Sequence, residues 1–184
     1  MGVVTPESRG DIRGPAWNHD RFPLDRQPVP ERQSPPGYTV RSANRLDPEE
    51  RMRLEVTSIA TWGRGGVANP DLAMLIMQTR SYRRDLDLVV EAPDGSVASF
   101  CVVWIDPVLR IGVFEPVGTH PDHRGRGLAK AMMWEGFRRA KALGARAVYV
   151  DAWATSPHAN ALYKSTGKVH FATDMYWKRE SAAQ

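Results

Sequence analysis

Residues 115–133 have the sequence EPVGTHPDHRGRGLAKAMM and mark a passage from a strand, through a glycine-rich turn, into a long helix. The preceding residues 110–114, RIGVF, extend the strand backwards. Pro116 inside this strand predicts an edge, a bulge or an interrupted ladder, because proline donates no backbone hydrogen bond. The helix is predicted to begin near Arg126 and to end at Gly144.

The turn from Arg124 to Ala129 has the composition of a phosphate-binding loop. Its two glycines let the backbone approach a ligand closely. The first amides of the following helix have no partner within the helix and lie at the positive end of the helix dipole. Arg124 and Arg126 add two guanidinium groups, so the turn predicts a binding site for a phosphate or diphosphate. The alternative, in which the glycines only make the turn and the arginines are solvated, stays open.

Turn and cap signals divide the rest of the chain. Asp94-Gly95 joins two β-rich runs into a hairpin. Asp47-Pro48 and Asn69-Pro70 each open a helix. A hairpin mixed with strand–helix–strand crossovers predicts an α/β or α+β domain with a mixed sheet. The predicted strands are 38–41, 85–92, 96–104, 110–119, 145–153 and 169–177, and the predicted helices are 48–59, 70–79, 126–143 and 157–167.

The first 37 residues differ from the remainder in proline content and in hydrophobic periodicity. They hold seven of the 14 prolines and show no helix or strand period. Residues 1–37 are therefore predicted to form a proline-rich arm or linker, and residues 38–184 the folded domain. Trp17, Phe22 and Leu24 give part of the arm a means of docking on the domain or on a second subunit.

Composition and charge exclude several classes of protein. The 184 residues are 42% hydrophobic and 25% charged, as in soluble globular domains. No apolar run is long enough to cross a membrane, and the N-terminal residues lack the apolar core of a secretory signal. A single cysteine fits a reducing compartment, so a cytoplasmic location is expected. The net charge of +4 comes from scattered residues, which favours a small anionic ligand over nucleic acid.

Three segments together resemble one family. They are EPVGTHPDHRGRGLAKAMM at 115–133, KALGARAVYVDAW at 141–153 and SPHANALYKSTGK at 156–168. This pattern resembles the GNAT superfamily of acyl-CoA-dependent N-acyltransferases, whose signature Q/R-x-x-G-x-G/A falls on Arg124 through Ala129. The wording HPDHRGRGLA is typical of bacterial members. The resemblance covers about residues 38–180.

The resemblance implies a mostly antiparallel sheet flanked by helices, with a splayed strand pair that binds acetyl-CoA as co-substrate and no metal. The backbone before the signature would bind the pantetheine arm, and the signature amides would bind the diphosphate. Ser156 stands where the family often has an asparagine near the cofactor, although serine is also a good helix N-cap. The implied cofactor-binding residues are Val117, Gly118, Thr119, Arg124, Gly125, Arg126, Gly127, Leu128, Ala129 and Ser156.

Tyr163 resembles the family's tyrosine near the thioester sulfur, which implies a general acid toward the departing thiolate. The alternative is a helix tyrosine packed against the sheet. A base is expected for the acceptor amine, whose pKa in water is near ~10. Glu115 is the first candidate, because strand alternation puts it on the face of Val117 and Thr119. Asp151 and His120 are the alternatives.

Three further features of the sequence bear on the prediction. Lys168 stands where the family usually has phenylalanine, after Gly167. His120 and His123 have the spacing of a metal pair, but no third ligand accompanies them in the sequence, so no metal site is expected. Cys101 lies among apolar strand residues, so we expect direct transfer in a ternary complex and no acyl-enzyme.

The sequence thus predicts an N-acetyltransferase that moves an acetyl group from acetyl-CoA to a primary amine of a small molecule or protein. The alternative is a non-catalytic acyl-CoA-binding or interaction module, or half of a tandem arrangement. A different acyl donor also stays open, as does a homodimer. The resemblance puts acceptor choice in residues 44–82, 152–156 and 168–176. The aromatic residues offered for an acceptor pocket are Trp62, Tyr82, Trp104, Trp153 and Trp177.

Overall fold

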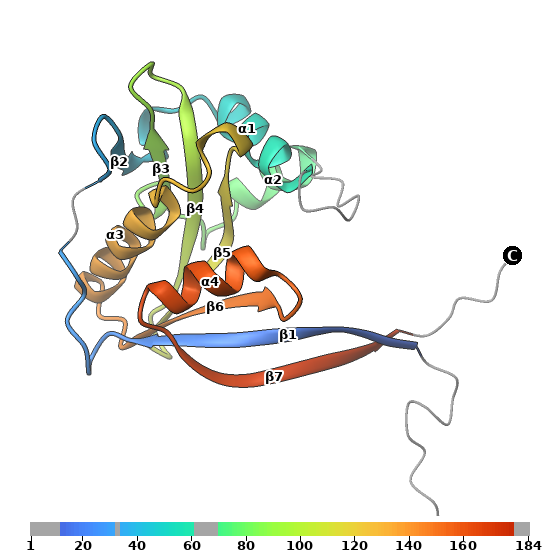
Figure 1. Cartoon of the computed structure of the whole chain (residues 1–184). Helices are drawn as coiled ribbons and strands as arrows, with labels where there is room; N and C mark the ends of the chain where they lie inside the picture. Colours follow the sequence, from blue (N-terminus) through green and yellow to red (C-terminus); the bar gives the residue numbers. More distant parts are fainter. Residues whose placement is uncertain (1–11, 32–33, 61–69, 179–184) are drawn as a thin grey trace, which may run out of the picture.

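The computed structural model describes residues 12–31, 34–60 and 70–178. Seven strands form one sheet in the order β2-β3-β4-β5-β6-β1-β7 (Figure 1). The strands are β1 (Ile12–Pro23), β2 (Thr39–Ser42), β3 (Asp87–Glu91), β4 (Val97–Asp106), β5 (Ile111–Thr119), β6 (Ala147–Trp153) and β7 (Val169–Lys178). The helices are α1 (Pro48–Ala60), α2 (Pro70–Met77), α3 (Leu128–Ala142) and α4 (Pro157–Ser165).

Every pairing in the sheet is antiparallel except that of β5 with β6. One apolar cluster joins α3 and α4 to the sheet and includes Met132, Phe137 and Tyr163. A second cluster joins Leu54 of α1 to Val89 and Phe100. Helices therefore flank both faces of a mixed, mostly antiparallel sheet, and the predicted fold class is confirmed. None of the helices in the described residues has the length and apolar character needed to cross a bilayer.

The predicted elements lie close to their observed positions, with one instructive shift. Helix α3 begins at Leu128, two residues later than predicted. Gly125 and Gly127 have φ angles of +76° and +78°, and this left-handed conformation cannot belong to a right-handed helix. The glycine-rich turn therefore extends to Gly127, which is the N-cap residue of α3.

The proline-rich arm predicted for residues 1–37 is wrong for residues 12–23. These residues form β1, which pairs antiparallel with β6 on one side and with β7 on the other. Phe22 and the following Leu24 are buried in the main core, where Phe22 stacks on Phe137 of α3 at 4.6 Å between ring centroids. The first 11 residues lie outside the described part of the chain.

The strand was not predicted because most of its inward face is polar. Asn18, Asp20 and Phe22 are every second residue of β1 and share the face toward α3 and α4, so no period-2 apolar pattern marks the strand. Pro15 falls within an irregular stretch of the β1–β7 ladder, between Arg13 and Ala16. Proline is tolerated there, although in a sequence it argues against a central strand.

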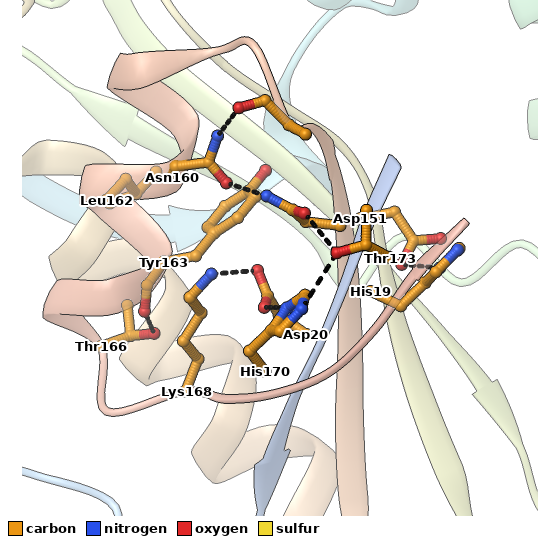
Figure 2. A network of polar contacts seen from close by, with 12 residues as sticks. His19, Asp20, Asp151, Asn160, Leu162, Tyr163, Thr166, Lys168, His170 and Thr173 are labelled. Carbon is orange, nitrogen blue, oxygen red and sulfur yellow. Dashed lines mark hydrogen bonds and ion pairs between the residues drawn. The ribbon is translucent and has the colours of Figure 1, made fainter. Parts of the chain in front are cut away.

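Asp20 binds β1 to the segment after α4. Its carboxylate is 0% exposed and accepts a hydrogen bond of 2.5 Å from Lys168 Nζ, while His170 Nδ1 lies 3.1 Å away (Figure 2). Lys168, which stands where the family usually has phenylalanine, thus forms an ion pair with a buried aspartate of β1. Phe22, from the same strand, packs beside Gly167.

We expect Lys168→Met to lower the free energy of unfolding by on the order of 3 kcal/mol, because it leaves the buried Asp20 carboxylate without its ammonium partner. Urea denaturation measures this loss. Lys164→Met is the matched control, since Lys164 is exposed on α4 and its replacement should change stability by less than about 0.5 kcal/mol. Equal effects of the two substitutions would contradict the assignment.

Candidate active site

Strands β5 and β6 pair over only four residues and then run apart (Figure 1). The parallel ladder begins at Ile111 with Ala147 and ends at Phe114 with Val150. Glu115 and Asp151 are the next residues on the two strands, so they lie where the strands separate. We call this region, from Glu115 to Thr119 on β5 and from Asp151 to Trp153 on β6, the split.

A bulge in β5 accompanies the split. Opposite β4, the register shifts between Cys101 and Val103, so that Glu115 and Pro116 both fall against a single residue. The Glu115–Pro116 peptide bond is cis. The register shift confirms the interrupted ladder predicted from Pro116. It also changes the alternation along β5, because Val117 packs against the same apolar cluster as Phe114. The expectation that Glu115 lies on the face of Val117 and Thr119 is therefore wrong.

Beyond the bulge, β5 is paired on one edge. Val117, Gly118 and Thr119 lie opposite Cys101, Phe100 and Ser99 of β4. In the described residues, the ladder with β6 does not extend to this segment. The edge toward the split is therefore open to another extended chain, as an acyl-pantetheine arm would be.

Gly118 is needed for packing beneath this edge. A Cβ atom at this position would lie 2.4 Å from Cε1 of Phe100, on β4. The Phe100 ring is fully buried, and the Arg51 guanidinium lies 4.1 Å from its centroid. The ring therefore cannot yield easily to a larger residue on β5.

The glycine-rich turn leads from the end of β5 into α3. A Cβ built on Gly125 or Gly127 would meet no other group within 4 Å, so the space in front of the turn is open. Arg126 is exposed, whereas Arg124 donates a hydrogen bond of 3.2 Å from Nε to the carbonyl oxygen of Thr119. Open space, the free first amides of α3 and a positive side chain fit a diphosphate.

Glu115 and Asp151 differ in their surroundings. Within the described structure, the Glu115 carboxylate has no hydrogen-bonded or ion-paired partner, whereas Asp151 Oδ1 accepts a 2.9 Å hydrogen bond from His19 Nδ1. Glu115 is partly exposed to solvent, but neighbouring protein atoms shield its carboxylate from part of the surrounding water. This desolvation, together with the negative charges of Asp151 and Glu55, raises the pKa of Glu115 to about 7.

Tyr163 projects from α4 and is 6% exposed (Figure 2). Burial raises the pKa of its phenol well above the usual value, and the charges of Glu115, Asp20 and Asp151 add to this effect. Tyr163 is therefore protonated at neutral pH and lies within electrostatic reach of Glu115. The tyrosine is buried in the main core cluster, as the packing alternative expects, and lies near enough to Glu115 and Asp151 for their charges to act on its pKa.

The other predicted residues lie in different places. His120 follows the end of β5, and its Nδ1 accepts a 3.3 Å hydrogen bond from the backbone of Asp122, so it belongs to the turn rather than to the point of separation. Ser156 is the N-cap residue of α4 but makes no side-chain capping bond. His123 Nδ1 lies 3.1 Å from the hydroxyl of Tyr38. In the described residues, no three His, Cys, Asp or Glu side chains are grouped to hold a metal ion.

The aromatic residues offered for an acceptor pocket are only partly placed there. Trp104 donates a hydrogen bond of 2.7 Å from Nε1 to the carbonyl oxygen of Glu115, and its ring lies 6.1 Å from that of Tyr82. Trp153 makes an edge-to-face contact with Trp17 of β1 at 5.6 Å. Trp62 and the side chain of Trp177 lie outside the described part of the structure.

Two residues near the split were missed in the sequence. His19 belongs to β1, which the sequence pattern did not reveal. Glu55 of α1 accepts a 3.2 Å hydrogen bond from Arg51, whose Nε also donates to the buried Asp87 at 2.9 Å. An arginine and a glutamate four residues apart indicate a helix pair, but nothing in their spacing points to Glu115.

Comparisons with known proteins agree with this fold. The crystal structure of a GCN5-related N-acetyltransferase from Sphaerobacter thermophilus superposes with a TM-score of 0.78 at 21% identity, over 97% of this chain and 56% of that one. A putative GNAT-family acetyltransferase from Novosphingobium aromaticivorans gives 0.63 at 22%, over 90% and 63%. A GNAT-family acetyltransferase from Brucella melitensis, in complex with acetyl-CoA, gives 0.58 at 16%, over 77% and 93%.

The chain thus spans little more than half the length of the first of these proteins. A search of curated protein sequences found no match. The sequence model of the acetyltransferase (GNAT) family matches residues 57–167, which is more than half of the chain and includes the glycine-rich turn, the split and α4. The chain belongs to the acetyltransferase (GNAT) family.

Proposed function

We propose that this chain is an N-acetyltransferase that moves an acetyl group from acetyl-CoA to a primary amine, by direct attack in a ternary complex. The observation that carries the proposal is the position of Glu115. In the described residues this carboxylate has no hydrogen-bonded or ion-paired partner and a raised pKa, and it lies where β5 leaves β6, on the strand that leads to the glycine-rich turn. A base, an open strand edge and a diphosphate site would thereby lie along one path.

The open edge of Val117–Thr119 would bind the pantetheine arm as a further strand, through backbone hydrogen bonds. The first amides of α3 and the Arg126 guanidinium would bind the diphosphate. This arrangement directs the thioester back along β5 toward Glu115 and Tyr163. Ser156 lies at the start of α4, on the far side of the split, where its hydroxyl would support the cofactor.

Glu115 would accept the proton that the amine loses as its nitrogen attacks the acetyl carbon. The C–N bond forms, the C–S bond breaks, and the electron pair of the C–S bond leaves with sulfur. The nitrogen attacks as the neutral amine, so an acceptor that binds as an alkylammonium ion, with a pKa near ~10, first releases one proton to water. Glu115 takes the second proton in step with C–N bond formation, because that bond makes the nitrogen more acidic. The nearby charges of Asp151 and Glu55 also favour a cationic acceptor.

Tyr163 would donate a hydrogen bond to the sulfur as negative charge develops on it. Its raised pKa keeps the hydroxyl protonated, but it also makes complete transfer of the proton to a thiolate unfavourable, since thiols have a pKa near ~8.5. Stabilisation of the leaving thiolate by this hydrogen bond is therefore the main role that we assign to Tyr163.

We expect the wild-type turnover rate to rise with pH through about 7, as Glu115 loses its proton, and then to level off. Glu115→Gln should remove this dependence and lower turnover at neutral pH by about 10²-fold, because an amide accepts no proton. Thiol release measured from pH 5.5 to 9 provides the test, with coenzyme A affinity as the control for folding. A variant with an unchanged profile would refute the assignment.

For Tyr163→Phe, we expect turnover to fall by roughly 10²-fold while the Kd for acetyl-CoA stays within about twofold, since only the hydroxyl is lost. Single-turnover kinetics and calorimetric titration separate these two quantities. If turnover were unchanged, Tyr163 would have only the packing role.

The seat for the diphosphate is tested by Arg126→Glu. Charge reversal at the turn should raise the Kd for coenzyme A by about tenfold or more, because a favourable charge pair becomes a repulsive one. Arg53→Glu is the matched control, since the side chain of Arg53 is 76% exposed on α1 and should leave the Kd unchanged.

Thermal melting separates the enzyme from the alternative of a non-catalytic module. Acetyl-CoA at ~100 times its Kd should stabilise the protein by about 2.7 kcal/mol, whether or not turnover follows. Stabilisation without thiol release from any amine would favour an acyl-CoA-binding module, or a chain that needs a second domain. Absence of stabilisation would contradict both.

A further inference from the structure

Two carboxylates face the split at the same level. The β5–β6 register advances one residue at a time from Ile111 with Ala147 to Phe114 with Val150. Continued by one residue, it brings Glu115 level with Asp151. Residues at the same level on neighbouring strands project from the same face of a sheet, so both carboxylates lie on the face opposite to Phe114 and Val150.

Only one of the two carboxylates has a partner. His19 of β1 lies opposite Asp151 in the β1–β6 register and donates a 2.9 Å hydrogen bond from Nδ1 to its Oδ1 (Figure 2). The Nε2 atom of the same ring lies 3.2 Å from Oδ2 of Asp174, on β7. The imidazole is thus held between two carboxylates, whereas Glu115 has no such partner in the described structure.

We propose that His19 is a positioning residue, which holds the Asp151 carboxylate by a hydrogen bond and thereby leaves Glu115 as the carboxylate that binds the proton. Two adjacent carboxylates resist being ionised together, and the one that accepts a hydrogen bond keeps its charge more easily. The role assigned here rests on the proposed function, since the proton comes from the acceptor amine. It also decides between two of the candidate bases.

Among the described residues, no cation forms an ion pair with Glu115, and none lowers its pKa. Glu55 on α1 accepts a hydrogen bond from Arg51, and the Trp104 indole of β4 donates to the Glu115 backbone. Burial and the charges of Asp151 and Glu55 raise the pKa of Glu115, in agreement with the geometry. The ionisable groups to be considered are Glu55 on α1, Tyr149 and Asp151 on β6, Tyr163 on α4, His19 and Arg21 on β1, and Asp174 on β7.

The proposal predicts opposite shifts for two substitutions. His19→Ala removes the donor to Asp151, so the carboxylate pair holds its proton more tightly and the titration of Glu115 should move up by about 0.5–1 pH unit. Asp151→Asn removes the neighbouring negative charge, so the titration should move down. In the double variant His19→Ala/Asp151→Asn, loss of His19 should have no further effect, because its target is gone.

The titration is measured on the full chain by carbon-13 NMR of the glutamate carboxyl groups, with Glu115→Gln used to assign the Glu115 signal. No acetyl-CoA or amine is present. His170→Ala is the matched control: it removes another imidazole next to β1, but that imidazole faces Asp20. If His19→Ala fails to fold, His19→Gln takes its place, since its amide donates a hydrogen bond without a charge and should give a smaller upward shift.

An unchanged Glu115 titration in both His19 variants would overturn the proposal, as would a His19 effect that persists in the double variant. The same variants, assayed for acetyl transfer across pH, should move the rising limb of the rate profile in the same directions. Titration shifts in a protein that transfers no acetyl group would support the role of His19 and reject the proposed function. Acetyl transfer with unshifted titrations would do the reverse.

Discussion

The end of the β5–β6 ladder at Phe114 and Val150 is the constraint on which the rest of this structure depends. A parallel pair that continued would satisfy its own backbone groups and leave no room for a ligand. The bulge at Glu115 and Pro116 releases β5 from β6 but keeps it paired with β4. One strand can then present an edge, a carboxylate and, at its end, the turn that leads into α3.

The N-terminal strand supports the other side of the split. Beyond Val150, β6 no longer pairs with β5, but β1 pairs with its other edge along the whole strand, from Ala147 to Trp153. The two faces of β1 make different contacts. On one face, Phe22 stacks on Phe137 of α3 and Asp20 binds Lys168, which follows α4. On the other face, His19 bonds to Asp151. The strand therefore stabilises the sheet and places a polar group beside the candidate base.

Features of the fold that depend on neighbouring residues could be predicted from the sequence, whereas features that depend on distant residues could not. The hairpin at Asp94-Gly95, the helix caps and the glycine-rich turn depend on neighbouring residues, and each was predicted close to its observed position. The interrupted pairing of β5 was predicted from Pro116 for the same reason, whereas the splayed strand pair was implied only by the family resemblance. The role of residues 12–23 was not, because Asp20 on a strand is explained only by Lys168, and His19 only by Asp151. Such pairs become visible only once topology brings distant segments together.

The position of β1 has a consequence for how the protein is made. The ribosome synthesises this strand before the other six strands of the sheet, yet both of its neighbours, β6 and β7, come from residues 147–178. The sheet can therefore not be completed until nearly the whole described chain has emerged, and pairings of such wide sequence separation form slowly. During synthesis, a polar, proline-containing segment waits in water without a partner. Asn18 and Asp20, which interrupt the apolar alternation of the strand, also disfavour its association with other unfolded chains before β6 and β7 are made.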